Sequence, residues 1–186
     1  MPSPDPHAVI RVIGCDPGDQ TGLCLLECTD KDPKIVEAIE VGLHTLTGQR
    51  ALNEFMDRAL ARGPVHGLAM EVPRHPYLPD AQKSRGMSLK EAIAVSASIS
   101  VGQGARRGEI RARAIDRDIP VLANVKSDLV KASVAHSRAT KEQVAQAIRL
   151  RFGMKVDDHA ADAIAVAYAA LKRDYATLIG RASRRR

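Results

Sequence analysis

A short apolar run near the amino terminus ends at a tight turn, and a second apolar run follows it directly. Residues 9–15 read VIRVIGC, Asp16-Pro17-Gly18 comes next, and residues 21–28 read TGLCLLEC. Apolar runs of this length, stopped by a Pro-Gly turn, are typical of buried strands. The two runs are close enough in sequence to pair as a hairpin. The chain is therefore predicted to begin with a strand hairpin inside a sheet.

The order of the remaining elements indicates an α/β fold. Further strands are expected over residues 34–43, 65–72 and 119–123, and helices over residues 50–62, 88–115, 127–134, 140–152 and 159–174. Three strands in sequence, followed by helices that alternate with strands, favour a central mixed sheet with helices on both faces. Catalytic and binding groups in such sheets gather at strand ends.

The length of 186 residues suits one domain. We expect a flexible amino terminus (residues 1–8), one folded domain (9–175) and a basic carboxy-terminal tail (176–186, ending GRASRRR). No apolar run approaches the 18 residues of a membrane span, and the start MPSPDPH lacks the pattern of a secretory signal. The three cysteines form no CxxC pair. These features predict a cytoplasmic protein without a membrane partner.

Charge is distributed unevenly along the chain. Residues 1–60 hold 5 basic and 10 acidic side chains, whereas residues 61–186 hold 23 basic and 12 acidic ones. A basic excess confined to two thirds of the chain favours a basic face and an anionic partner. With only five aromatic residues in the chain, a base-stacking platform is disfavoured. A nucleic acid is therefore expected to be held through its phosphates.

Four chemically conspicuous residues fall at element ends. Asp16 ends the first strand, Glu71 ends the fourth, and His159 and Asp162 stand three residues apart, hence on one face, in an otherwise apolar helix. Each has a purely structural alternative, such as a turn residue for Asp16 or a surface acid for Glu71. Taken together, they suggest a site for two hard divalent cations.

The order and spacing of six motifs resemble the RuvC-type Holliday-junction resolvases (crossover junction endodeoxyribonucleases) of the RNase H-like nuclease superfamily. The motifs are VIGCDPG-x-x-TG, GLAME, GARRG, IPV, KEQV and HAADAIA, spread from Val9 to Leu171. The resemblance implies an α/β, RNase H-like fold: a five-stranded mixed sheet of order 3-2-1-4-5, flanked by helices, with its first three strands antiparallel.

The same resemblance implies a metal-dependent, structure-selective endonuclease acting in DNA recombination and DNA repair. In the family, the positions of Asp16, Glu71, His159 and Asp162 hold two Mg²⁺ ions, which serve in-line hydrolysis of a phosphodiester. Mn²⁺ is expected to substitute. Family members act as homodimers that nick a four-way (Holliday) DNA junction symmetrically, and a branch-migration helicase is a possible further partner.

Several residues are candidates for DNA binding by this resemblance. They are Lys126, Lys131, Arg138, Lys141, Arg106, Arg107 and Tyr77. For the basic residues an ordinary solvated surface charge is the alternative. Tyr77 is the only aromatic residue near the position where the family carries a junction wedge, and a loop or core role is its alternative.

Two alternatives to the resolvase hypothesis stay open. One is a related nuclease for other branched or single-stranded nucleic acid, and the other is a catalytically silent DNA-junction-binding module. An actin-like ATPase is disfavoured, because such folds need two domains of this size. His159 stands where most of the family has Asp, so we expect Mn²⁺ to support faster cleavage than Mg²⁺, and activity to decline below about pH 6.5.

Overall fold

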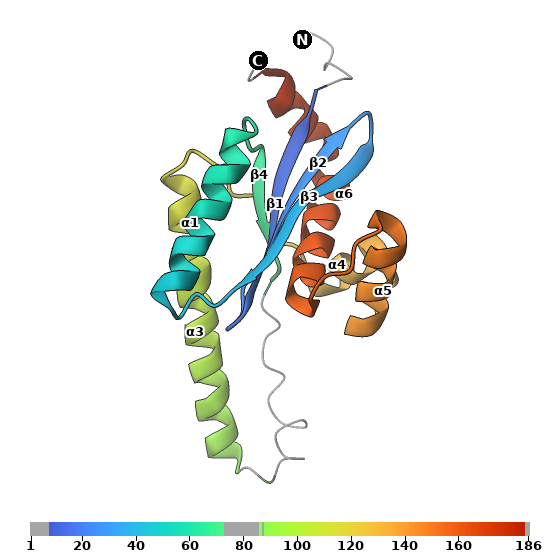
Figure 1. Cartoon of the computed structure of the whole chain (residues 1–186). Helices are drawn as coiled ribbons and strands as arrows, with labels where there is room; N and C mark the ends of the chain where they lie inside the picture. Colours follow the sequence, from blue (N-terminus) through green and yellow to red (C-terminus); the bar gives the residue numbers. More distant parts are fainter. Residues whose placement is uncertain (1–7, 73–85, 87, 185–186) are drawn as a thin grey trace.

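The structure, a computed structural model, describes residues 8–72, 86 and 88–184. Its sheet has four strands in the order β3-β2-β1-β4: β1 (Ile10–Asp16), β2 (Thr21–Thr29), β3 (Asp32–Val41) and β4 (Gly67–Met70). The first three strands are antiparallel neighbours and β4 runs parallel to β1 (Figure 1). The predicted amino-terminal hairpin is confirmed, with Ile10 paired to Cys28 and Asp16 to Gly22.

The prediction of a fifth regular strand over residues 119–123 was wrong for the described chain. This segment meets β4 and the residue after it only through isolated parallel bridges, Leu68 with Val121 and Glu71 with Val125. Leu68 and Glu71 are three residues apart, whereas their partners Val121 and Val125 are four apart. One extra residue therefore bulges out and breaks the ladder.

Helices cover both faces of the sheet (Figure 1). They are α1 (Leu46–Ala61), α3 (Leu89–Ile115), α4 (Ser127–Val134), α5 (Lys141–Phe152) and α6 (Asp158–Arg184). One apolar cluster joins the sheet to α6 and through it to α4 and α5, and a second joins the other face to α1 and the end of α3. None of the described helices is both long and apolar enough to cross a membrane.

The prediction of a separate basic tail from residue 176 was wrong for residues 176–184. The last helix continues through this stretch to Arg184, and it buries Leu178, Ile179 and Ala182. These side chains recur at helical spacing and join the same apolar cluster as the rest of α6. Their burial holds the segment in the helix despite its basic composition. At the other end, Ala8 is buried, and residues 1–7 lie outside the described residues.

Side-chain caps define the start of two helices next to the candidate site. Ser88 and Glu91 form a capping box at α3, and Thr140 and Gln143 form the predicted one at α5. Helix α5 ends at Gly153, which adopts the left-handed conformation (φ 69°) that glycine tolerates. The cap at Thr140 fixes Lys141 as the first residue of α5.

The approach of α6 to the sheet depends on small residues on both sides. Seven alanines of its first half are buried: Ala160, Ala161, Ala163, Ala165, Ala167, Ala169 and Ala170. Opposite them, a Cβ atom on Gly14 would overlap the carbonyl oxygen of Ala163, and one on Gly22 would overlap that of His159. This close packing brings the first turns of α6 over the end of β1.

Candidate active site

The carboxyl ends of two parallel strands bring two acids together. Asp16 is the last residue of β1 and Glu71 directly follows β4. Cys15 pairs with Met70, so the two acids are the next residues in register. The Glu71 N–H donates to the Cys15 carbonyl oxygen at 3.3 Å. Strand pairing therefore places both acids side by side at the carboxyl ends of β1 and β4.

The first turns of α6 add the other two predicted ligands. Nδ1 of His159 lies 3.3 Å from Oδ2 of Asp16. Asp162 is one turn further along, and its Oδ2 lies 3.4 Å from Nζ of Lys141 at the start of α5. Side chains 143 residues apart in sequence thus meet because α6 crosses the end of β1.

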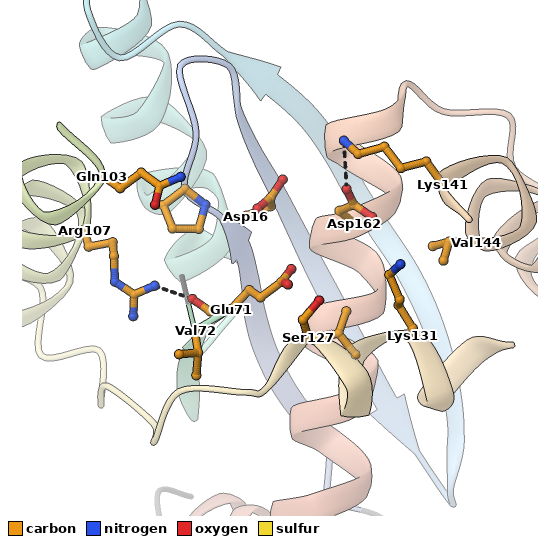
Figure 2. A pocket seen from close by; sticks show the side chains of 12 residues that line it. Asp16, Glu71, Val72, Gln103, Arg107, Ser127, Lys131, Lys141, Val144 and Asp162 are labelled. Atoms are coloured by element: carbon orange, nitrogen blue, oxygen red, sulfur yellow. Dashed lines mark hydrogen bonds and ion pairs between the residues drawn. The ribbon is translucent and has the colours of Figure 1, made fainter. Parts of the chain in front are cut away.

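Three of the predicted ligands, Asp16, Glu71 and Asp162, line a cavity of about 330 Å³, whereas His159 is not one of its lining residues. Figure 2 shows carboxylates facing it from the sheet and α6, with α3 on one side and α4 and α5 on the other. The lining includes three carboxylates (Asp16, Glu71, Asp162), three basic residues (Arg107, Lys131, Lys141) and two neutral polar residues (Gln103, Ser127). A cavity with both charges on its walls can bind cations and phosphate together.

The ionised form of Asp16 is not fully stabilised by its surroundings. Burial raises the pKa of Asp16, and the negative charge of Asp162 raises it further. The hydrogen bond from His159 and the charges of His159 and Lys141 oppose this rise without cancelling it. The ionised form of Asp16 is therefore disfavoured at this site, and a bound cation would favour it.

The donor set fits a divalent metal ion in its chemistry. Carboxylate oxygens are the ligands that Mg²⁺ prefers, and a bound cation would oppose the burial and the Asp162 charge that raise the pKa of Asp16. In the part of the chain that the structure describes, no three His, Cys, Asp or Glu side chains converge closely enough to form a coordination shell. The predicted ligands lie near one another at the carboxyl ends of β1 and β4 without forming such a shell, and Lys141 lies beside Asp162.

The predicted DNA-binding residues in and around α4 and α5 divide into two groups. Lys131 and Lys141 line the cavity, and Nζ of Lys131 also donates to the carbonyl oxygen of Ala139. Lys126 precedes α4 and Arg138 lies between α4 and α5; both are exposed, and neither lines the cavity. Tyr77 lies outside the described residues.

The two predicted arginines of α3 are engaged within the protein. Arg106 forms an ion pair with Asp19 in the turn between β1 and β2. Arg107 is only 8% exposed, and its Nη1 donates to the backbone carbonyl oxygen of Glu71. The phosphate-contact interpretation of Arg107 overlooked this internal bond.

Sequence reasoning also missed Gln103 and Ser127 as lining residues. Gln103 stands one turn before Arg107 on α3, and Arg107 in turn shares a helix face with the buried residues Ile110 and Ala114. That spacing of three and four residues marks the inward face of α3 and could have identified Arg107 as buried. Ser127 carries no comparable signal, because its place depends on the irregular segment before α4.

Comparison with known proteins finds one curated relative, although no family model matches the chain. The chain is 30% identical over 161 residues to the crossover junction endodeoxyribonuclease RuvC of Trichlorobacter lovleyi, a match covering 85% of this chain and 83% of the relative.

Solved structures share the fold. The chain is similar to Thermus thermophilus RuvC (TM-score 0.65, 20% identity, covering 91% of this chain and 98% of that one). It is also similar to T. thermophilus RuvC in complex with a Holliday junction substrate (TM-score 0.62, 19% identity, covering 88% and 96%). A weaker likeness is to the yeast mitochondrial Holliday junction resolvase Ydc2 (TM-score 0.50, 16% identity, covering 96% and 86%). At these identities the structures establish the fold alone.

Proposed function

The chain belongs to the RuvC family of crossover junction endodeoxyribonucleases, and from that premise we propose that it resolves four-way DNA junctions by paired, metal-dependent nicks. The observation that carries this proposal is one cavity lined by three carboxylates and three basic side chains. Such a cavity suits a phosphodiester together with the cations that hydrolyse it. The ends of β1 and β4 and the first turns of α6 supply the carboxylates.

Asp16, Glu71, His159 and Asp162 are the residues that would hold divalent cations. Bound Mg²⁺ or Mn²⁺ would supply a Lewis acid that activates water and neutralises charge on the phosphate. The chain's own task is to hold these ligands in place. The His159 ring contacts Asp16 at 3.3 Å and thereby orients that carboxylate toward the cavity.

Lys131 and Lys141 are proposed to hold the DNA phosphate. Both line the cavity beside the carboxylates. The ammonium of Lys141 lies near the negative charge of Asp162 in the DNA-free protein, and a phosphate brought to the cavity offers it a second anionic partner. Lys126 and Arg138, which are exposed and lie outside the cavity lining, are proposed to contact the DNA backbone further from the cut.

Paired nicks require two active sites, so the functional unit is proposed to be a homodimer. The early turns of α3 favour this, because Ile93 and Val101 are 51% and 72% exposed and the helix extends beyond the sheet (Figure 1). Small residues of the same stretch, Ala97, Ser98 and Ser100, are exposed too. An isologous contact along α3 would bury this surface.

The experiment that tests the proposal compares labelled DNA substrates. Four-way, three-way, single-stranded and linear DNA are incubated with the protein and Mg²⁺, Mn²⁺ or a chelator. We expect symmetric cuts in the four-way junction only, with metal present. Equal cutting of single-stranded or three-way DNA would favour the related-nuclease alternative, and tight junction binding without cutting would favour the silent module.

Junction affinity and the oligomeric state of the protein test the proposal independently of cleavage. Junction affinity is expected to fall steeply with salt, since several Lys and Arg contacts release counterions. Light scattering at micromolar concentration is expected to give a dimer. A monomer both with and without junction DNA contradicts the homodimer part of the proposal.

A further inference from the structure

Arg107 is a buried cation in the wall of the candidate site. Its side chain is 8% exposed, and it lies on the same face of α3 as Ile110 and Ala114, which are fully buried. Burial lowers the pKa of its guanidinium, and the nearby charge of Arg111 lowers it further. A charged group is retained at such a position when it makes directed hydrogen bonds that replace water.

Among the residues that the structure describes, this guanidinium donates to the backbone directly after β4. Nη1 of Arg107 donates to the carbonyl oxygen of Glu71, as the dashed line in Figure 2 shows. The two backbone N–H groups here donate to neighbouring segments. The Glu71 N–H donates to Cys15, and the Val72 N–H donates to the carbonyl oxygen of Val125 at 2.7 Å.

The strand register explains why this carbonyl needs a side-chain donor. In a parallel ladder, a residue donates its N–H to the carbonyl oxygen of one residue on the neighbouring strand. Its own carbonyl oxygen then accepts from the N–H two residues further along that neighbouring strand. Cys15 accepts from the Glu71 N–H, so the ladder would next use the N–H of residue 17. Residue 17 is Pro17, and proline has no N–H to donate.

We propose that Arg107 is a positioning residue, whose guanidinium replaces the backbone donor that Pro17 lacks and so fixes Glu71 at the cavity. The inference rests on the proposed role of Glu71 in cleavage. The turn at Pro17 ends β1 directly after Asp16. Because Pro17 has no N–H, the backbone hydrogen bond that would have fixed the Glu71 carbonyl is missing. The guanidinium of Arg107 supplies that bond from α3, the layer on the other side of the sheet from α6.

The first test separates positioning from phosphate binding by steady-state kinetics on a four-way junction. Arg107→Met keeps the length of the side chain and removes its donors. We expect kcat to fall about tenfold or more, as for loss of a charged hydrogen bond, while KM changes less than threefold. Arg107→Lys, which keeps one donor, should recover part of kcat. A raised KM with unchanged kcat would show a phosphate contact and overturn the proposal.

The second test does not depend on cleavage. Hydrogen–deuterium exchange of the DNA-free protein reports the Glu71 and Val72 amides directly. We expect faster exchange there in Arg107→Met, and no change in Arg111→Met, an exposed arginine one turn further along α3. Unchanged exchange in Arg107→Met overturns the proposal whether or not the protein cuts junctions. A wild-type protein that cuts no junction overturns the proposed function and leaves this measurement decisive for Arg107.

The strand register predicts one further result, at Pro17. Pro17→Ala restores an N–H at the position where the ladder needs a donor. In the Pro17→Ala/Arg107→Met double variant, exchange at Glu71 and Val72 should therefore be slower than in Arg107→Met alone. Exchange as fast as in Arg107→Met contradicts the assignment of Arg107 as the substitute donor.

Discussion

Nζ of Lys141 lies 3.4 Å from Oδ2 of Asp162. A lysine that opens α5 thus contacts a carboxylate that we propose as a metal ligand. The Lys141 side chain is 53% exposed and that of Asp162 18%, so solvent screens the pair and its strength is modest. The ammonium and a metal ion would nevertheless compete for the same oxygens.

Removing the Lys141 ammonium should change metal affinity and cleavage rate in opposite directions. We expect Lys141→Met to bind Mn²⁺ up to about fivefold more tightly in the DNA-free protein, the scale of an exposed ion pair, and yet to cleave junctions more slowly because a phosphate contact is lost. Titration calorimetry with Mn²⁺ measures the first effect. Lys155→Met, at an exposed lysine away from the cavity, is the control. Unchanged Mn²⁺ affinity in Lys141→Met would exclude competition.

Asp16→Asn should lose activity and gain stability. Cleavage is expected to vanish while junction binding survives, because the amide is a poor metal ligand and the basic contacts remain. The raised pKa of Asp16, caused first by burial and then by Asp162, means that its ionised form is less favourable in the folded than in the unfolded chain. This destabilisation is present above the folded-state pKa and is relieved as pH falls through it.

The neutral amide removes that cost at pH 7, so Asp16→Asn should have a higher Tm than wild type in the presence of chelator. The Tm difference should shrink as pH is lowered, because protonation of Asp16 relieves the same cost in wild type. Thermal unfolding from pH 4 to pH 8 checks both statements. A lower Tm for Asp16→Asn at pH 7 contradicts them.

His159 should set the metal preference. Imidazole nitrogen suits Mn²⁺ better than Mg²⁺, which prefers oxygen ligands, so Mn²⁺ is expected to support faster single-turnover cleavage. His159→Asp should remain active, narrow the gap between the two metals and extend activity to lower pH, since a histidine must lose its proton before it binds metal. Rates measured for both metals across pH test this. If His159→Ala cuts as fast as wild type at every pH, His159 is not a ligand.

Gly22 should be intolerant of a methyl group. A Cβ atom there would overlap the His159 carbonyl oxygen, so Gly22→Ala must displace the start of α6 and is expected to cost about 3 kcal/mol or more, at the upper end for overpacking. It should also lose cleavage, because His159 and Asp162 move with the helix. Gly180→Ala is the matched control: nothing lies within 4 Å of its Cβ, and alanine in a helix should raise stability by about 0.5–1 kcal/mol.

Much of the architecture could be predicted because it is recorded in local pattern. The apolar runs around Asp16 predicted the first hairpin, and the Thr140 capping box predicted where α5 begins; both were confirmed. The spacing of His159 and Asp162 predicted that they share a helix face. Each of these signals depends on residues within one turn or one strand.

The elements predicted wrongly from the sequence are those whose secondary structure depends on residues far away in the chain. The fifth strand fails because one extra residue between Val121 and Val125 breaks register with β4, a mismatch that only the paired strand reveals. The basic segment up to Arg184 stays helical because Leu178 and Ala182 are buried in the core on α6.

The sequence by itself determined which residues are candidates for the chemistry: an acid at the end of each of two strands, and a His/Asp pair on one helix face. Only the tertiary structure decided what each of them contacts. His159 reaches Asp16 because Gly14 and Gly22 let α6 approach the sheet. Arg107 bonds to the Glu71 carbonyl oxygen because Pro17, two residues beyond Cys15 in the ladder, has no N–H. Both contacts join segments far apart in the chain, and close packing and strand register, which no local pattern encodes, bring them within reach.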